Sequence, residues 1–167
     1  GNICGFDEPR WFTHKSAIFS AGLRDMDAIL GRDDRLVEKL RDTAEKVCGE
    51  FAAVIGTPVP AVIATDYRAL RRMAEKKTGL PVIAVDTDGM ELYDVGEEKA
   101  YLALMQRFAE AALPVQHGRI GVLGLTPLDF GSPRDETHLR DQLRAQGWKQ
   151  VWCYGNGSLE EIRQASS

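Results

Sequence analysis

Pro81-Val82-Ile83-Ala84-Val85-Asp86-Thr87-Asp88-Gly89 is the stretch of sequence that decides the fold. Its apolar residues run without polar interruption between a proline and an acidic, glycine-containing loop, which predicts a short strand. Such a strand is typical of a parallel sheet that lies between helices.

Segments of helical period lie on both sides of this strand. The upstream segment begins at Thr65 or Asp66, whose side chain can accept free backbone N–H groups, and it ends at Gly79. The downstream segment runs from about Asp94 to Leu113. This alternation predicts an α/β fold of Rossmann-like parallel sheet units flanked by helices. Further strands are expected at 51–57, 119–125 and 151–154, and further helices at 34–48, at 132–147 and after a Ser158–Glu161 capping box.

The link between residues 113 and 118 is the weakest point in this alternation. Pro114 stops the preceding helix, and Gly118 closes a polar connection. Residues 1–116 are therefore expected to form a first α/β unit with an irregular N-terminal segment, and residues 117–167 the start of a second unit. The chain begins without Met and stops at Ser167, a few residues into the last expected helix. We expect a fragment in which the second unit is truncated.

The composition excludes several classes of protein. The formal net charge is −4 with acids and bases interspersed, so the chain lacks the basic stripe that neutralises a nucleic-acid backbone. No apolar run approaches the ~20 residues that a membrane-spanning helix needs. The three cysteines are widely spaced and odd in number, which favours a reducing compartment over a disulfide framework. We expect a cytoplasmic protein that binds neither nucleic acid nor membrane.

Candidate binding residues follow the expected strands. In open parallel sheets, ligands bind beyond the carboxyl ends of the strands. Four loops occupy such positions, at 57–60, 86–89, 126–129 and 155–158. The first two loops supply the candidate cofactor-binding residues, which are Thr57, Asp86, Thr87, Asp88 and Gly89.

One cysteine is a candidate metal ligand. Cys48 lies near the end of an amphipathic helix and Cys153 in an apolar strand, so both are expected to be packing thiols. Cys4 instead lies in a loop rich in Gly, Asp and Pro, where an exposed thiolate can ligate iron. Cys4 is therefore added to the candidate cofactor-binding and metal-binding residues.

The loop 86–89 also matches a different chemistry. An apolar strand followed by Asp86 and then by Asp88 resembles the first motif of haloacid dehalogenase-type phosphotransferases. In that family the first carboxylate attacks phosphorus, and the second transfers a proton beside Mg²⁺. The family also needs a later acidic pair at a strand end, which does not follow Asp88. An acidic loop that caps the sheet is the favoured interpretation, and the phosphotransferase remains an alternative.

Several longer stretches match one family in the same order. The last of them reads Gly-Asn-Gly-Ser-Leu-Glu-Glu-Ile, a strand-to-helix step. The matching stretches are Met26–Leu36, Val54–Asp66, Pro81–Met90, Gly121–Thr126, Leu139–Gly147 and Gly155–Ile162. Together they resemble the nitrogenase component 1-type oxidoreductase family, and the resemblance covers nearly the whole chain.

This resemblance implies a fold, a cofactor and partners. It implies the nitrogenase component 1/chelatase-like arrangement of α/β units and an anaerobic host. Complete subunits of the family pair with a homologous subunit, hold an iron–sulfur cluster, and receive electrons from an ATP-dependent iron protein. They reduce a multiply bonded substrate such as dinitrogen or a tetrapyrrole double bond. When the family motif is carried onto Val54–Asp66, its strand-end cysteine falls on Pro58, which has no ligand atom.

Two functions follow for the whole protein. In the first, it is a reductase subunit whose iron–sulfur cluster uses fewer cysteines, with Cys4 and the partner's thiolates completing the site. In the second, it is a non-redox module of the same fold that binds a small molecule or tetrapyrrole, or serves as an assembly scaffold. We expect the fragment alone to hold no cofactor and to be inactive, because such a cluster lies between subunits.

Overall fold

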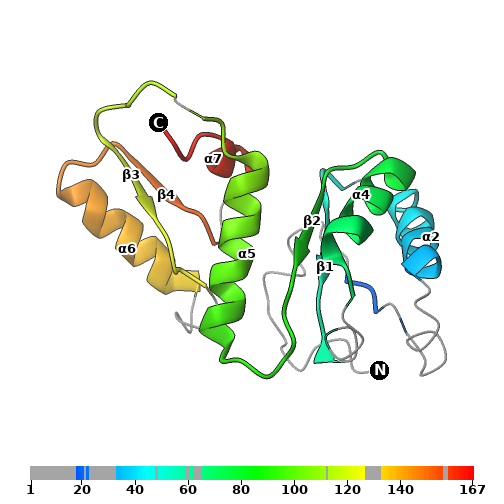
Figure 1. Ribbon diagram of the computed structural model, residues 1–167. Coiled ribbons are helices and arrows are strands. Elements are labelled where there is room, and N and C mark those ends of the chain that lie inside the picture. Colours follow the sequence, from blue (N-terminus) through cyan, green and yellow to red (C-terminus); the bar gives the residue numbers. More distant parts are fainter. Residues whose placement is uncertain are drawn as a thin grey trace. The chain divides into compact units, whose positions relative to one another are not determined.

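Strands and helices alternate along the chain as expected (Figure 1). The computed structural model describes residues 18–20, 22, 33–47, 49–58, 61, 65–111, 113–126, 133–155 and 158–167. No helix among these residues is long and apolar enough to cross a membrane. The elements are α2 (Asp33–Ala44), β1 (Ala52–Ile55), α4 (Tyr67–Thr78), β2 (Val82–Val85), α5 (Tyr93–Phe108), β3 (Arg119–Val122), α6 (Pro133–Ala145), β4 (Gln150–Cys153) and α7 (Leu159–Arg163).

The chain divides into two units, residues 1–103 and 104–167, with the division inside α5. In the first unit β1 pairs with β2, and Ala52 lies opposite Val82. In the second unit β3 pairs with β4, and Arg119 lies opposite Gln150. Both pairs are parallel, which confirms the predicted α/β class. The predicted border between a first α/β unit at 1–116 and a second unit at 117–167 stays a prediction.

The core of the first unit lies between the β1–β2 pair and the two helices α2 and α4. Val37 of α2, Leu70 and Ala74 of α4, and Val82 of β2 are all buried and in contact. β2 is also buried at Ile83 and Val85, as expected for a strand without polar alternation. The helices contribute one apolar stripe each, so their other faces are left for solvent or partners.

The core of the second unit lies between the β3–β4 pair and α6. Val151 and Cys153 of β4 are fully buried, and Leu125 joins them after the end of β3. Leu139 and Leu143 of α6, four residues apart, pack against this cluster. Cys153 is therefore a packing thiol, as predicted, whereas Cys4 and Cys48 lie outside the described residues.

Three predicted helix caps are confirmed. Asp66 caps α4 by accepting the backbone N–H groups of Arg68 and Ala69, each at 3.0 Å. Gly79 ends α4 with a positive φ of 71°. Ser158 caps α7, its hydroxyl oxygen accepting the backbone N–H of Glu161. The predicted contribution of Ser132 to the start of α6 lies outside the described residues.

Two helices end earlier than their apolar pattern predicts. α5 stops at Phe108 rather than near Leu113, because the Glu110 backbone N–H bonds to the Arg163 carbonyl of α7 at 2.8 Å. This bond comes from a segment distant in sequence, which the local pattern cannot anticipate. α2 stops at Ala44, and the turn that follows contains a bond of three-residue spacing, from the Lys46 N–H to the Thr43 carbonyl.

Leu70→Ala should lower the free energy of unfolding by about 2–5 kcal/mol, because it empties a position that is 1% exposed between two helices and a strand. Met73→Ala on the same helix is the matched control. Met73 is 39% exposed, so we expect a loss below about 1 kcal/mol. Urea unfolding followed by circular dichroism measures both. Equal losses would contradict the burial of α4 described here.

Candidate functional site

The carboxyl ends of β1 and β2 share one edge of the sheet, because the two strands are parallel. Gly56, directly after β1, donates its backbone N–H to the Val85 carbonyl at 2.9 Å. Thr87, after β2, donates its hydroxyl to the Gly56 carbonyl at 2.8 Å. These bonds hold the ends of both strands together. We call residues 56–58 and 86–89 the strand-end edge.

Gly56 is the point of closest approach within this edge. A Cβ built on Gly56 would lie 2.2 Å from the Thr87 carbonyl oxygen and 2.6 Å from the Tyr67 hydroxyl. Both separations are far below van der Waals contact, so only glycine is accommodated. Sequence reasoning missed Gly56 and Tyr67. The available signal was a glycine at the end of an apolar strand, which marks close backbone approach.

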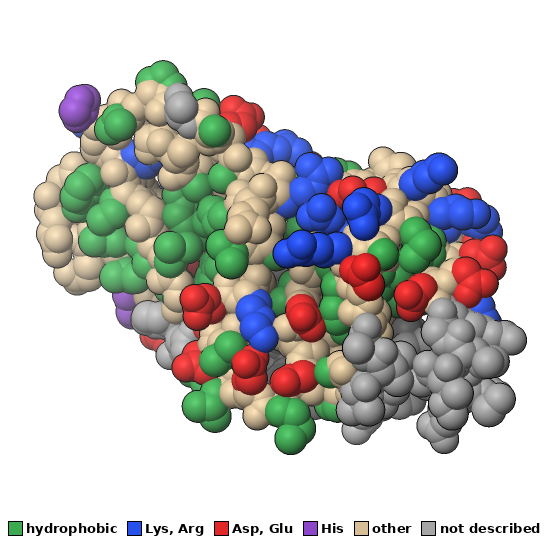
Figure 2. All heavy atoms as spheres, viewed as in Figure 1, with side chains coloured by type: hydrophobic (Ala, Val, Ile, Leu, Met, Phe, Trp, Pro, Cys, Tyr) green, Lys and Arg blue, Asp and Glu red, His purple; other side chains and the backbone are tan. Residues whose placement is uncertain are grey.

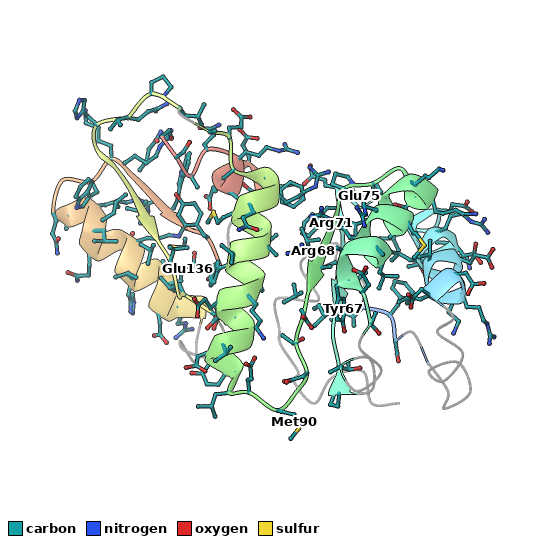
Figure 3. All side chains as sticks on the ribbon, viewed as in Figure 1. Tyr67, Arg68, Arg71, Glu75, Met90 and Glu136 are labelled. Atoms are coloured by element: carbon teal, nitrogen blue, oxygen red, sulfur yellow. The ribbon has the colours of Figure 1, made fainter. Side chains whose placement is uncertain are left out.

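Tyr67, the first residue of α4, brings its hydroxyl to this edge (Figure 3). The hydroxyl is buried and has no hydrogen-bond partner among the described residues. Burial, and then the negative charge of Asp86, raise the pKa of Tyr67 above its ordinary value. The phenol therefore keeps its proton. The strand-end edge thus holds a neutral O–H donor that lacks an acceptor.

The acidic loop of the edge is shaped by its own backbone. Asp88 Oδ1 accepts the Met90 backbone N–H at 2.8 Å, and this bond is the main reason that the pKa of Asp88 is lowered. Gly89 has a positive φ of 74°, and a Cβ there would lie 3.0 Å from Pro58. Asp86 is exposed. Asp88 thus organises the loop, while Asp86 is the carboxylate that is accessible to a ligand.

The strand-end edge brings together most of the residues that the sequence singled out. Thr57, Asp86, Thr87, Asp88 and Gly89 all belong to it, and their role in binding stays a prediction. Cys4 lies outside the described residues. The loops at 126–129 and 155–158 are only partly described and follow β3 and β4 of the second unit.

The second unit holds a polar cluster beside β4, which sequence reasoning also missed. Arg140 Nε of α6 lies 2.7 Å from Glu136 Oε1, and the same guanidinium donates to the Val151 carbonyl. Glu136, labelled in Figure 3, is only 8% exposed. Glu161 of α7 adds a second carboxylate, whose buried Oε2 has no hydrogen-bond partner among the described residues. One arginine therefore balances two carboxylates above the Cys153 thiol.

Burial governs the titration of this cluster. Burial is the first cause that raises the pKa of Glu161, and the charge of Glu136 adds to it while Arg140 opposes it. The pKa of the Cys153 thiol is raised in the same way, first by burial and then by the two carboxylates. Cys153 is therefore kept as a protonated, unreactive thiol.

Comparison with known proteins identifies the family of this chain. Residues 8–167 match the model of the nitrogenase component 1 type oxidoreductases. The chain belongs to this family. The resemblance seen in the sequence is thereby confirmed, and this nitrogenase component 1-type chain carries its strand-end edge within the matched region.

Individual relatives agree with the family. The chain is 26% identical over 159 residues to the nitrogenase iron-molybdenum cofactor biosynthesis protein NifE of Klebsiella pneumoniae, covering 87% of this chain and 34% of that protein. Two structures of nitrogenase Cp1, at pH 6.5 and pH 5, share the fold at 20% identity with TM-scores of 0.72 and 0.73. Each covers 89% of this chain, which spans 29% and 30% of the nitrogenase chains. The nitrogenase component 1-type chain thus spans about a third of the length of the relatives that it matches.

The described residues do not form an iron–sulfur cluster site at this edge. Such clusters are held by cysteine thiolates, and no cysteine belongs to the strand-end edge at 56–58 and 86–89. Pro58, on which the sequence comparison predicts the family's strand-end cysteine to fall, is exposed at the edge and has no ligand atom. No group of three His, Cys, Asp or Glu side chains among the described residues can hold a metal ion.

The same observations weaken the phosphotransferase alternative. The chain belongs to a different family, and Asp88 is engaged with the Met90 backbone rather than held ready for proton transfer. The predicted acidic loop that caps the sheet describes Asp86 and Asp88 better.

Gly56→Ala should lower the free energy of unfolding by about 1–3 kcal/mol, because its methyl group forces the two strand ends apart. Gly96→Ala is the matched control. Its added Cβ meets Thr87 Cγ2 at an ordinary 3.5 Å inside α5, where alanine favours the helix, so we expect a gain of about 0.4–1 kcal/mol. Urea titration gives both values, and opposite signs are expected. A neutral Gly56→Ala would contradict the close approach.

Glu161→Gln should raise the melting temperature more at about pH 7 than at about pH 4. The native state binds the Glu161 proton more tightly than the unfolded chain does, because its pKa is raised. Stability from this group is therefore complete below its ordinary pKa of 4.5 and is lost as pH rises through the raised value. Glutamine removes that loss. A larger Glu161→Gln effect at about pH 4 than at about pH 7 would refute the assignment.

Proposed function

We propose that this chain forms a non-redox binding module of a nitrogenase component 1-type protein, which holds a small molecule such as a tetrapyrrole, or a cofactor in assembly, at the strand-end edge. The observation that carries the proposal is the side-chain chemistry of this edge. Its exposed or partly exposed polar groups are hydroxyls and carboxylates, and it contains no cysteine. In our interpretation of the sequence, Pro58 takes the position of the family's strand-end cysteine. Oxygen groups suit polar ligands, whereas clusters require thiolates.

Further support comes from the preformed geometry of the edge. Thr87 and Gly56 join the strand ends, and Gly89 lies against Pro58, so the loops are fixed before any ligand arrives. Asp86 presents an exposed carboxylate, and Tyr67 contributes a buried neutral donor beside Gly56. A rigid set of few polar groups is typical of small-molecule sites. The likeness to a cofactor biosynthesis protein agrees with an assembly role.

A reductase subunit is the second candidate function, and the family match over residues 8–167 favours it. In this form Cys4 and thiolates of a homologous partner subunit would ligate an iron–sulfur cluster. An ATP-dependent iron protein would supply electrons for the reduction of a multiply bonded substrate. Both candidates place the protein in a reducing cytoplasm and within an oligomer.

The two candidates differ in iron content. The full chain is to be expressed anaerobically with the product of its neighbouring gene, and iron, sulfide and electron paramagnetic resonance are measured on the purified complex. A binding module gives substoichiometric iron and no cluster signal, in the native protein and in Cys4→Ser alike. Stoichiometric iron that Cys4→Ser abolishes would establish the reductase instead.

A free-base porphyrin provides a positive test of binding. We expect it to bind the full chain with a shift of its Soret band, and Asp86→Asn to weaken this binding about tenfold through loss of a charged contact. Asp94→Asn, an exposed carboxylate outside the strand-end edge, is the matched control and should leave the affinity unchanged. Equal effects of both variants would exclude the strand-end edge as the binding site.

A further inference from the structure

The exposed side of α4 concentrates positive charge. This helix holds five Lys or Arg side chains and one carboxylate in 12 residues, within a chain of net charge −4. Figure 2 shows blue side chains gathered over α4. The overall composition of the chain, with interspersed acids and bases, gives no sign of this concentration of positive charge on α4. The five cations are Arg68, Arg71, Arg72, Lys76 and Lys77, and all are exposed.

Three arginines in the first two turns of α4 are neighbours on its surface. Arg68 and Arg72 are four residues apart, and Arg68 and Arg71 are three apart, the spacings that place side chains side by side on a helix. Figure 3 shows Arg68 and Arg71 on the same side of α4. None of the three forms an ion pair with a carboxylate in the described part of the chain. We call Arg68, Arg71 and Arg72 the basic face.

The nearest carboxylates are engaged with backbone. Glu75, the acid within α4, accepts the Val82 backbone N–H at 3.2 Å and so bonds to the sheet. Asp66 accepts the N–H groups of Arg68 and Ala69 as the helix cap. The charges of Arg72 and Arg68 act on Asp66, but neither guanidinium forms an ion pair with it. The basic face is thus not neutralised by its own helix.

This arrangement opposes the stability of α4 itself. A helix favours acidic side chains in its first turn because of its dipole, yet the first turn of α4 holds no acid and contains Arg68. Like charges at three- and four-residue spacing repel one another. Both unfavourable terms would be relieved by negative charge brought from outside the helix.

We propose that the basic face is a docking surface for a carboxylate-rich surface of a partner protein. The guanidinium group binds carboxylates through paired hydrogen bonds, and arginine is enriched in protein interfaces where lysine is depleted. A nucleic acid is disfavoured, because the face is short and the chain is acidic as a whole. The proposal concerns a different surface from the strand-end edge and does not depend on the ligand bound there.

The test uses a labelled helical peptide with glutamates at four-residue spacing as the probe. Its binding to the full chain is measured by fluorescence anisotropy at about 50 mM salt, where screening is weak. We expect Arg68→Gln/Arg71→Gln/Arg72→Gln to weaken binding at least about tenfold. The charge-conserving Arg68→Lys/Arg71→Lys/Arg72→Lys should weaken it severalfold, because lysine lacks the paired donors.

A matched variant removes the same charge elsewhere. Lys46→Gln/Arg144→Gln/Lys149→Gln neutralises three exposed cations outside α4, and we expect it to change the affinity less than about twofold. Thermal unfolding checks that every variant is folded. It should show the triple glutamine variant of the basic face to be at least as stable as the native chain, because repulsion within α4 is removed.

Three outcomes would overturn the proposal. The first is equal weakening by the basic-face variant and the matched variant, which indicates net charge alone. The second is tighter binding of an oligonucleotide of the same charge as the peptide, which indicates a phosphate-binding face. The third is no peptide binding at low salt. None of these outcomes bears on iron content or porphyrin binding, so the function of the strand-end edge is judged separately.

Discussion

The parallel pairing of β1 with β2 is the constraint on which the candidate site depends. It sets Ile55 opposite Val85, so that both strands end at the same level. Only then can the Thr87 hydroxyl reach the Gly56 carbonyl and Gly89 lie against Pro58. A shift of one residue would turn every side chain of one strand to the opposite face and separate these loops. The register of the core thus positions the polar groups of the edge.

Much of the fold could be predicted from the sequence, because its determinants are local. Uninterrupted apolar runs such as Val82–Val85 specify the strands, and Asp66, Gly79 and Ser158 mark helix ends through bonds to adjacent backbone. Features that depend on distant segments were missed. The early end of α5 requires Arg163, and the burial of Glu136 requires Arg140 and β4 together. The spacing of apolar residues along the sequence does not indicate contacts between such distant segments.

The residues of the candidate site also fall into those that the sequence could predict and those that it could not. Residues that follow a strand, such as Asp86 and Thr87, could be named from their position alone. Gly56 and Tyr67 could not, because their importance lies in a close approach between segments that are not adjacent in sequence. The concentration of positive charge on α4 could not be predicted either. A net charge of −4 with mixed signs did not indicate that α4 would expose three arginines that have no ion pair among the described residues.

The bond between Glu110 and Arg163 has a consequence for the order of events during synthesis. It joins the end of α5 to the end of α7, and the Ser166 hydroxyl adds a second link to the Glu110 carbonyl. The buried apolar residues described in the first unit all lie between residues 37 and 85, so this core can form while the ribosome is still adding the rest. The Glu110–Arg163 bond can form only after α7 has been added to the growing chain. A nascent chain should therefore acquire protease resistance in two steps, with the later one only after residue 163 has emerged.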